Sequence, residues 1–106
     1  MITDEQAERA NDFIRDRADD IARAKASRVY LEEFRKTKKA LLIQKAPDGT
    51  VQAKESYAYA HPEYEELLTG LKDAVEDEEK LRWQMVAAQT KIEIWRTQQS
   101  NKRAGM

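Results

Sequence analysis

Glycine and proline, the residues that most often interrupt helices, are absent from the first 46 positions of this 106-residue chain. Proline lacks an amide hydrogen, and glycine loses more backbone entropy on folding than any other residue. Thr3 and Gln6 have the spacing of a capping box, in which the Thr3 hydroxyl accepts a hydrogen bond from the Gln6 amide. The sequence therefore predicts one long helix over about residues 3–45.

Two breaks follow this stretch. Pro47-Asp48-Gly49 is a strong turn signal, and Pro62 suits the first position of a second helix. We therefore expect a connector over residues 46–61, a helix over about residues 62–99 and a frayed polar tail over residues 100–106. A chain of this length is expected to form a single helical-hairpin domain, residues 1–106.

Seam positions in the second helix recur in alternating steps of four and three residues, the 3.5-residue period of a coiled coil. They are Leu67, Leu71, Ala74, Glu78, Leu81, Met85, Ala88, Ile92 and Trp95. A matching stripe in the first helix comprises Ala10, Ile14, Ile21, Ala24, Leu31, Phe34, Leu41 and Leu42. These patterns predict an all-α fold in which two long helices pair along their stripes.

The charge distribution indicates how the two helices meet. Residues 1–24 carry seven acids and four bases, and residues 25–45 carry seven bases and two acids. Residues 63–79 carry eight acids and one base, whereas residues 80–106 carry six bases and one acid. Folding back at the connector puts each block beside one of opposite sign, while a parallel pair would align like charges. We therefore expect an antiparallel coiled-coil hairpin.

A short connection would place residues whose numbers sum to about 108 opposite each other. In that register Trp95 meets Phe13 and Ile14, and Leu67 meets Leu41 and Leu42. Glu78 interrupts the seam, and we expect it to pair with Arg28 as a register-setting ion pair.

Further apolar residues fall at or beyond the edges of the two stripes: Phe13, Val29, Tyr30, Leu42, Leu68, Val75, Val86 and Ile94. A two-helix hairpin buries one stripe per helix and leaves such residues exposed. Exposed apolar strips mark contacts with other proteins. The sequence therefore predicts an oligomer, most simply a homo-oligomer.

Composition excludes several classes of function. The chain has no cysteine, so disulfides and thiolate metal sites are excluded, and its formal net charge of −1 gives no overall attraction to nucleic acid or membrane. No apolar stretch approaches a membrane span, and the first residues do not resemble a signal peptide. We expect a soluble, intracellular protein with no cofactor.

The one histidine, His61, is the only imidazole that could bind a metal, together with Glu65 four residues later. The simpler interpretation is that His61 caps the helix that begins at Pro62. No phosphate-binding glycine loop, nucleophile elbow or metalloprotease motif is present. We therefore predict no metal site, no catalytic residues and no enzymatic activity.

The basic part of the first helix is the best candidate for a binding site. Its outward-facing bases could follow a phosphate backbone, and the nearby Tyr57, Tyr59 and Tyr64 could stack on bases of a single strand. The predicted nucleic-acid-binding residues are Arg35, Lys36, Lys38, Lys39, Lys45 and Lys54. The alternative is that the lysines form a solvated helix face and that the tyrosines pack the connector onto the helix ends, since charge runs are usually solvated faces.

The connector Tyr57-Ala58-Tyr59-Ala60-His61-Pro62-Glu63-Tyr64 and the helix ending in Lys91-Ile92-Glu93-Ile94-Trp95-Arg96 resemble small helical proteins of bacteriophages. The plan of a basic first helix, an aromatic loop and an acidic second helix, over residues 20–103, resembles UvsY-type recombination mediators. The resemblance implies binding of single-stranded DNA, ring formation and loading of a recombinase onto strands covered by single-strand binding protein. It also implies that Arg35, Lys36, Lys38 and Lys39 contact DNA.

Two hypotheses follow. In the first, the chain is a phage-type recombination accessory protein that binds single-stranded DNA and assists a recombinase or annealing protein. In the second, it is a protein–protein interaction module, an inhibitor or adaptor, whose acidic stretch Glu63–Glu79 could mimic a nucleic acid.

Overall fold

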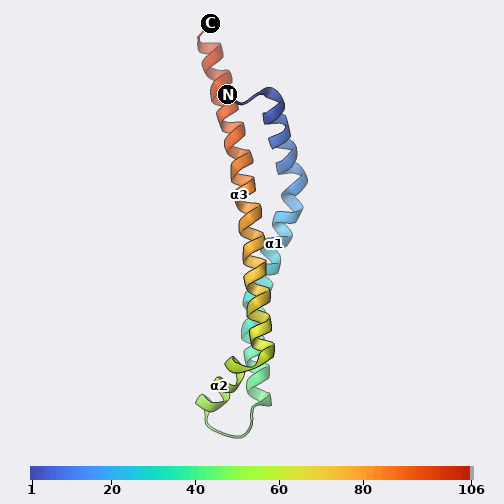
Figure 1. Cartoon of the computed structure of the whole chain (residues 1–106), viewed down its shortest axis with the longest axis vertical. Coiled ribbons are helices and arrows are strands. Elements are labelled where there is room, and N and C mark those ends of the chain that lie inside the picture. Colours follow the sequence, from blue (N-terminus) through green and yellow to red (C-terminus); the bar gives the residue numbers. More distant parts are fainter. Residues whose placement is uncertain (106) are drawn as a thin grey trace. The chain divides into compact units, whose positions relative to one another are not determined.

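The computed structural model describes residues 1–105 and contains three helices there: α1 (Asp4–Lys45), α2 (Val51–Ala60) and α3 (Pro62–Ala104) (Figure 1). No strand occurs among these residues, so the predicted all-α fold is confirmed. Within the same range, none of the helices combines the length and apolar character that crossing a membrane requires.

The helix bounds agree with the sequence in part. α1 ends at Lys45 and α3 begins at Pro62, as predicted. The connector, expected without helix, contains the ten residues of α2, and the tail expected to fray continues α3 through Ala104. The last predicted tail residue, Met106, lies outside the described residues.

Side-chain caps fix the beginnings of the three helices. Thr3 and Gln6 form the predicted capping box: the Gln6 amide donates to Thr3 Oγ1 over 3.1 Å, and the Thr3 amide donates to Gln6 Oε1 over 2.9 Å. Thr50 Oγ1 accepts from the Ala53 amide and caps α2. The Glu63 amide donates to His61 Nδ1 over 3.1 Å at the start of α3, so the predicted capping role of His61 is confirmed.

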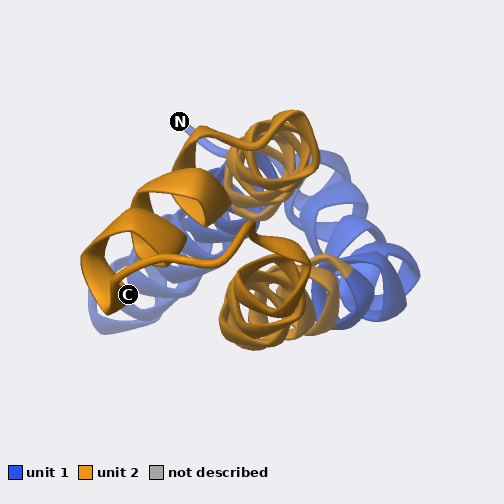
Figure 2. Cartoon of the chain, turned by 90° about the horizontal axis from the view of Figure 1, so that it is seen from below, with its two compact units in different colours: residues 1–23, 79–106 blue, residues 24–78 orange. Residues whose placement is uncertain are grey.

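The chain divides into two compact units (Figure 2). Unit 1 combines Met1–Arg23 with the α3 residues from Glu79 onward, and unit 2 comprises Ala24–Glu78. The acidic start of α1 therefore lies in the same unit as the basic end of α3. The basic end of α1 lies in the same unit as the acidic start of α3, so each unit combines the segments of opposite charge that the sequence predicts to meet.

In unit 1, α1 and α3 run antiparallel. Asp4 Oδ1, at the start of α1, accepts hydrogen bonds from Trp95 Nε1 over 2.7 Å and from Gln99 Nε2 over 3.4 Å. Two turns further along α1, Ala10 and Phe13 line a groove with the earlier α3 residues Gln84, Ala87, Ala88 and Lys91. Among residues 1–23 and 79–105, Ala7, Ala10 and Ala88 are buried, and their small side chains allow the helices to approach closely.

In unit 2 the two helices also run antiparallel. Arg28 pairs with Glu78, as the sequence predicts, and Lys38 Nζ lies 3.4 Å from Glu63 Oε2. The Arg28 guanidinium also donates two hydrogen bonds of 2.9 and 3.0 Å to Glu32 on its own helix. These carboxylates, Glu78 first, raise the pKa of Arg28. Because the Arg28 guanidinium has both Glu78 and Glu32 as partners, its ion pair with Glu78 can fix the register of α1 against α3.

Burial along α3 follows the predicted seam. From residue 67 to residue 95, all nine predicted seam positions are buried or half-buried, and Gly70 is the one other residue of that stretch that is not exposed. In α1 the predicted stripe is likewise covered, with one exception: Leu41 is exposed. The 3.5-residue period therefore identifies the covered face of both long helices.

The main hydrophobic cluster lies where α2 packs on the end of α1. Leu42 has no exposed surface, Ala58 of α2 is equally buried, and Tyr64 of α3 and the half-buried Ile43 complete the cluster. Leu42 was expected both on the α1 stripe and at its edge, and in the structure Ala58 of α2 and Tyr64 of α3 share its buried cluster. The alanine at position 58 lets the α2 backbone lie close against the leucine.

The predicted register holds at the Arg28–Glu78 pair but is wrong by about two to three helical turns at Leu67 and Trp95. Leu67 lines a groove with Tyr30, Leu31 and Phe34 instead of meeting Leu41 and Leu42. In unit 1, Trp95 bonds Asp4 instead of meeting Phe13 and Ile14. The prediction assumed a short connection, whereas α2 covers the last turns of α1 and α3 begins beside Lys38.

Leu42→Ala should destabilise unit 2 by about 2–5 kcal/mol, because it removes a fully buried side chain that α2 covers and leaves a cavity. The matched control is Leu41→Ala at the neighbouring position. Because 44% of Leu41 is exposed, the loss of unfolding free energy should stay below about 1 kcal/mol. Urea unfolding followed by circular dichroism at one protein concentration measures both. Equal losses in the two variants would contradict this account of the cluster.

Candidate functional site

The six predicted nucleic-acid-binding residues all lie in unit 2. Five of them, Arg35, Lys36, Lys38, Lys39 and Lys45, are on the last three turns of α1, and Lys54 is on α2. The structure separates them into two groups. Lys38, Lys39 and Lys54 are half-buried, whereas Arg35, Lys36 and Lys45 are exposed.

Lys38 occupies a position of the covered stripe. Its ammonium is paired with Glu63 at the start of α3, and its side chain is only 23% exposed. This ammonium lowers the pKa of the Glu63 carboxyl, and the positive charge of Lys45 acts in the same direction. Lys38 therefore joins α1 to α3 and is not a free phosphate ligand.

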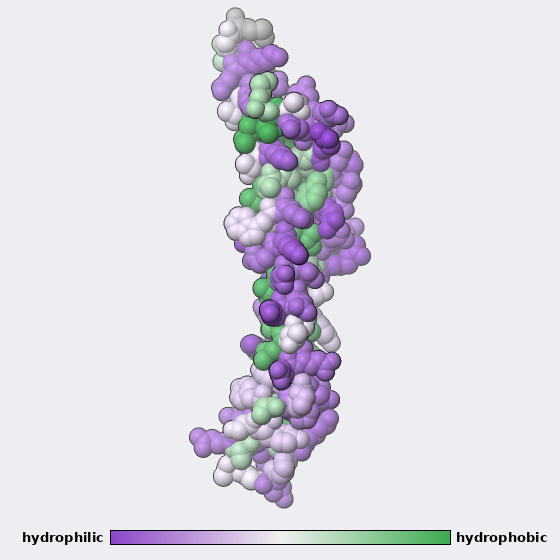
Figure 3. Space-filling model, in the orientation of Figure 1, coloured by the Kyte–Doolittle hydropathy of each residue, from purple (hydrophilic) through white to green (hydrophobic). Residues whose placement is uncertain are grey.

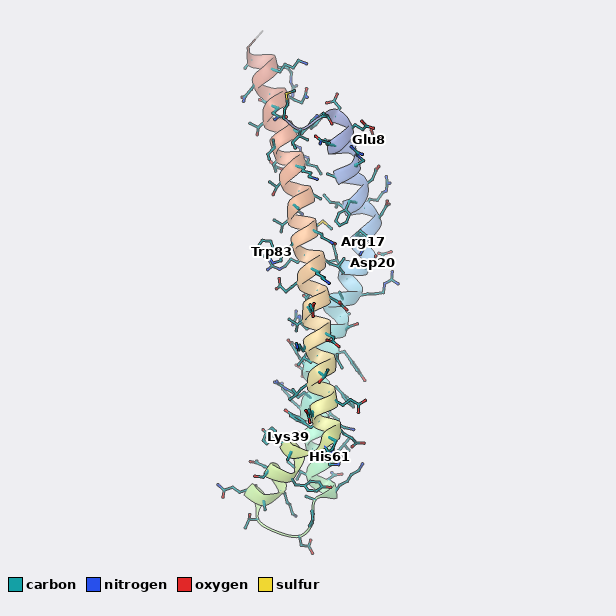
Figure 4. All side chains as sticks on the ribbon, viewed as in Figure 1. Glu8, Arg17, Asp20, Lys39, His61 and Trp83 are labelled. Atoms are coloured by element: carbon teal, nitrogen blue, oxygen red, sulfur yellow. The ribbon has the colours of Figure 1, made fainter. Side chains whose placement is uncertain are left out.

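Lys39 contacts the aromatic connector (Figure 4). Its Nζ lies 4.6 Å from the centroid of the Tyr59 ring, and Tyr59 in turn makes an edge contact of 5.4 Å with the buried Tyr64. Tyr59 raises the pKa of Lys39. Tyr59 and Tyr64 thus pack the connector onto α1, which is the alternative that the sequence left open for the tyrosines.

The exposed bases do not form a single face. Lys36 follows Arg35 directly, so their side chains leave the helix about 100° apart, and Lys45 is nine residues from Lys36, about 180° around the helix. Lys36 Nζ also lies 3.5 Å from Glu33 Oε2. The predicted track for a phosphate backbone is therefore reduced to three bases that point in different directions.

A second surface has no counterpart among the predicted site residues. Trp83, Val86, Thr90 and Ile94 of α3 are all exposed, and we call them the α3 outer strip. They recur in steps of three or four residues, and none is charged. Trp83 is 59% exposed and points away from the α1 segment of unit 1 (Figure 4). Figure 3 shows the molecule from the same side, with hydrophobic residues at the surface between hydrophilic ones.

Local contacts keep the α3 outer strip apolar. The Thr90 hydroxyl donates to the Val86 carbonyl over 2.8 Å, so its polar group is used within the helix. The Arg82 guanidinium lies 4.5 Å from the Trp83 ring centroid and donates to Glu79 Oε2 over 2.7 Å. Trp83 was missed in the sequence because it lies off the 3.5-residue seam. A search for a second uncharged stripe on the same helix would have found it.

Comparison with protein-family models, with curated proteins and with solved structures finds no match to this chain. The resemblance to UvsY-type recombination mediators therefore stays a prediction, and the function has to be argued from the surface just described.

Glu63→Gln should reduce the loss of stability at acid pH. A carboxyl whose pKa is lowered in the folded state stabilises that state fully above its ordinary pKa of 4.5, and this contribution is lost as the pH falls through the lowered value. Between about pH 5 and pH 3, the melting temperature should therefore fall less in the variant than in the unmodified chain.

The control is Glu66→Gln, on the same helix, whose exposed carboxylate makes no ion pair within residues 1–105. The Glu66→Gln variant should lose nearly as much melting temperature at acid pH as the unmodified chain does. A Glu63→Gln profile that coincides with that of the unmodified chain would show that the contact with Lys38 does not stabilise the fold.

Proposed function

We propose that this chain is a non-catalytic assembly protein, in which α1 and α3 form an antiparallel coiled-coil hairpin that binds protein surfaces and oligomerises. The α3 outer strip carries this proposal. An uncharged helix face with an exposed tryptophan has an unfavourable contact with water unless another surface covers it.

The distribution of burial supports the same conclusion. Leu42 and Ala58 are the residues with no exposed surface in the described chain, and most seam positions are only half-buried. Val29 and Tyr30 of α1 are exposed as well, as the sequence predicts. A hairpin with so little enclosed apolar surface gains stability when it binds a partner that covers these residues.

The composition of the α3 outer strip suits a protein partner better than a nucleic acid. Tryptophan is among the residues most enriched at the centres of protein interfaces, where it supplies a large rigid apolar contact. The strip contains no lysine or arginine that could neutralise a phosphate. Arg82, at its edge, is paired with Glu79.

Trp83→Lys should weaken binding to a protein partner by about 2 kcal/mol or more, roughly 30-fold in Kd, because it puts a charge at the centre of the apolar contact. Partners are captured from cells that express the chain, purified, and titrated against both forms by calorimetry.

Gln84→Lys is the matched control, since it adds the same charge at the adjacent exposed position, which faces the groove of unit 1. The control should bind like the unmodified chain, and circular dichroism should show equal helix content in all forms. Equal weakening by both variants would mean that added charge, and not the α3 outer strip, decides the binding.

Binding of single-stranded DNA is a second candidate, favoured by the exposed side chains of Arg35, Lys36 and Lys45. Weak contacts of this kind would be multiplied in an oligomer. A role beside a recombinase, and the location in a bacterial cytoplasm, depend on the resemblance and stay predictions.

Replacing Arg35, Lys36 and Lys45 together by glutamate should reduce the salt dependence of binding to a single-stranded oligonucleotide, since each lost phosphate contact lowers the slope by about 0.7. Fluorescence anisotropy at several salt concentrations measures the slope. The control replaces Arg9, Arg15 and Arg23 of unit 1, which changes the net charge equally. Unchanged or equally reduced slopes in both variants would remove these three bases from the DNA site.

A further inference from the structure

The loop between α1 and α2 contains the one aspartate of residues 1–105 that lies outside the helices (Figure 1). This residue is Asp48, and Gly49 follows it directly. Both residues are exposed. Water therefore has access to an aspartate–glycine pair that no helix holds in place.

An aspartate followed by glycine has a reaction open to it within its own main chain. The Gly49 amide nitrogen attacks Cγ of the Asp48 carboxyl and closes a succinimide ring, while the amide hydrogen and the carboxyl hydroxyl leave together as water. A second water molecule then opens the ring. Addition at Cγ restores aspartate, whereas addition at the main-chain carbonyl of residue 48 gives isoaspartate. Water is released once and consumed once, so the product has the mass and the charge of the original chain.

Gly49 favours this reaction in two ways. It has no side chain to hinder the approach of its amide nitrogen to the neighbouring carboxyl. Its amide also makes no hydrogen bond within residues 1–105, since the bonds beside it join Ala46 to Ile43 and Lys54 to Thr50. The nitrogen therefore does not have to leave a protein partner before it attacks.

The remaining aspartates are in a different situation. All seven lie in α1 or α3, and none of them precedes a glycine: Asp4, Asp12, Asp16, Asp19, Asp20, Asp73 and Asp77. Beyond the first turn of a helix, each amide donates to the carbonyl four residues before it. Ring closure there requires the helix to open locally, so these aspartates are internal controls for Asp48.

Isoaspartate at position 48 changes the approach to α2. The main chain then runs through Cβ of residue 48 and gains one carbon atom, two residues before Thr50. Thr50 Oγ1 caps α2 by accepting from the Ala53 amide over 3.1 Å, and Ala58 of α2 lies in the buried cluster with Leu42. A lengthened loop displaces the cap from the position in which Ala58 packs on Leu42.

We infer that Asp48 is a site of spontaneous isomerisation, and that its isoaspartate product loosens α2 from the end of α1. The reaction consumes no partner, metal or enzyme, so it occurs in the purified chain. All the residues involved belong to unit 2. The inference therefore goes beyond the proposed function and does not depend on the α3 outer strip.

Peptide mapping of the purified full-length chain, after weeks of warm incubation at neutral pH, tests the site. Electron-transfer fragmentation distinguishes isoaspartate from aspartate at each position. Isoaspartate at position 48 should exceed that at each helical aspartate by at least about tenfold, because a helical aspartate reacts only when its helix opens. No isoaspartate at position 48, or equal amounts at the helical aspartates, would overturn the assignment.

Gly49→Ala is the matched control. A Cβ added at Gly49 would meet the Ala53 Cβ at 3.6 Å, an ordinary van der Waals contact, and the backbone of Gly49 does not have a positive φ. The loop should therefore keep its conformation, with equal helix content by circular dichroism, while the new methyl group hinders the attack. Isoaspartate should form several-fold more slowly, and an unchanged rate would show that Gly49 does not promote the reaction.

Asp48→Asn gives a second readout that does not depend on the control. Its amide leaves as ammonia on ring closure, which proceeds faster than loss of water, so the intact mass should rise within the same incubation. A mass that stays constant would contradict attack by the Gly49 nitrogen.

Hydrogen exchange of the isoaspartate form, separated by chromatography, measures the effect on α2. Amides of residues 51–60 should exchange faster than in the unmodified chain, because their cap and their contact with Leu42 are weakened. Amides of residues 79–100 in unit 1 should exchange as before. Equal exchange of residues 51–60 in the two forms would overturn the loosening of α2.

Discussion

The contact of α2 with the end of α1 determines how the rest of unit 2 is arranged. Because Ala58 lies against Leu42, the last turns of α1 are covered by α2, and α3 begins beside Lys38 instead of beside Lys45. The ion pair of Lys38 with Glu63 follows from that position of α3, whereas the pair of Arg28 with Glu78 is the one that a short connection also predicts. The helical connector thus moves the start of α3 along α1, away from the end of that helix.

The features that depend on local chemistry could be predicted from the sequence. The capping box at Thr3, the helix start at Pro62 and the nine seam positions of α3 all follow from hydrogen bonding near in sequence or from helical periodicity. The register could not be predicted, because it depends on whether the connector is a loop or a helix. Residues 51–60 include good helix formers, three alanines with Gln52, Lys54 and Glu55, but the turn signal at residues 47–49 and Pro62 favour a loop over the whole segment between them.

The candidate site was predictable only in its position along the chain. Composition identifies Lys38 and Lys39 as bases, but it gives no sign that Glu63 and Tyr59 come from other helices to contact them. The α3 outer strip was overlooked for a different reason: Val86 and Ile94 were recognised individually as off the seam, whereas Trp83 and Thr90 connect them into a face. That face lies opposite the predicted seam, so a search for a second uncharged stripe along α3 identifies it.

The two tryptophans of this chain occupy contrasting surroundings, and this has a spectroscopic consequence. The Trp95 indole is half-buried in unit 1 and donates to Asp4, whereas the Trp83 indole is largely in water under a guanidinium group. Their fluorescence emission therefore reports on separate events. Trp95 follows the closure of α1 on α3, and Trp83 follows the covering of the opposite side of the helix, so intrinsic emission can distinguish folding from association without an added label.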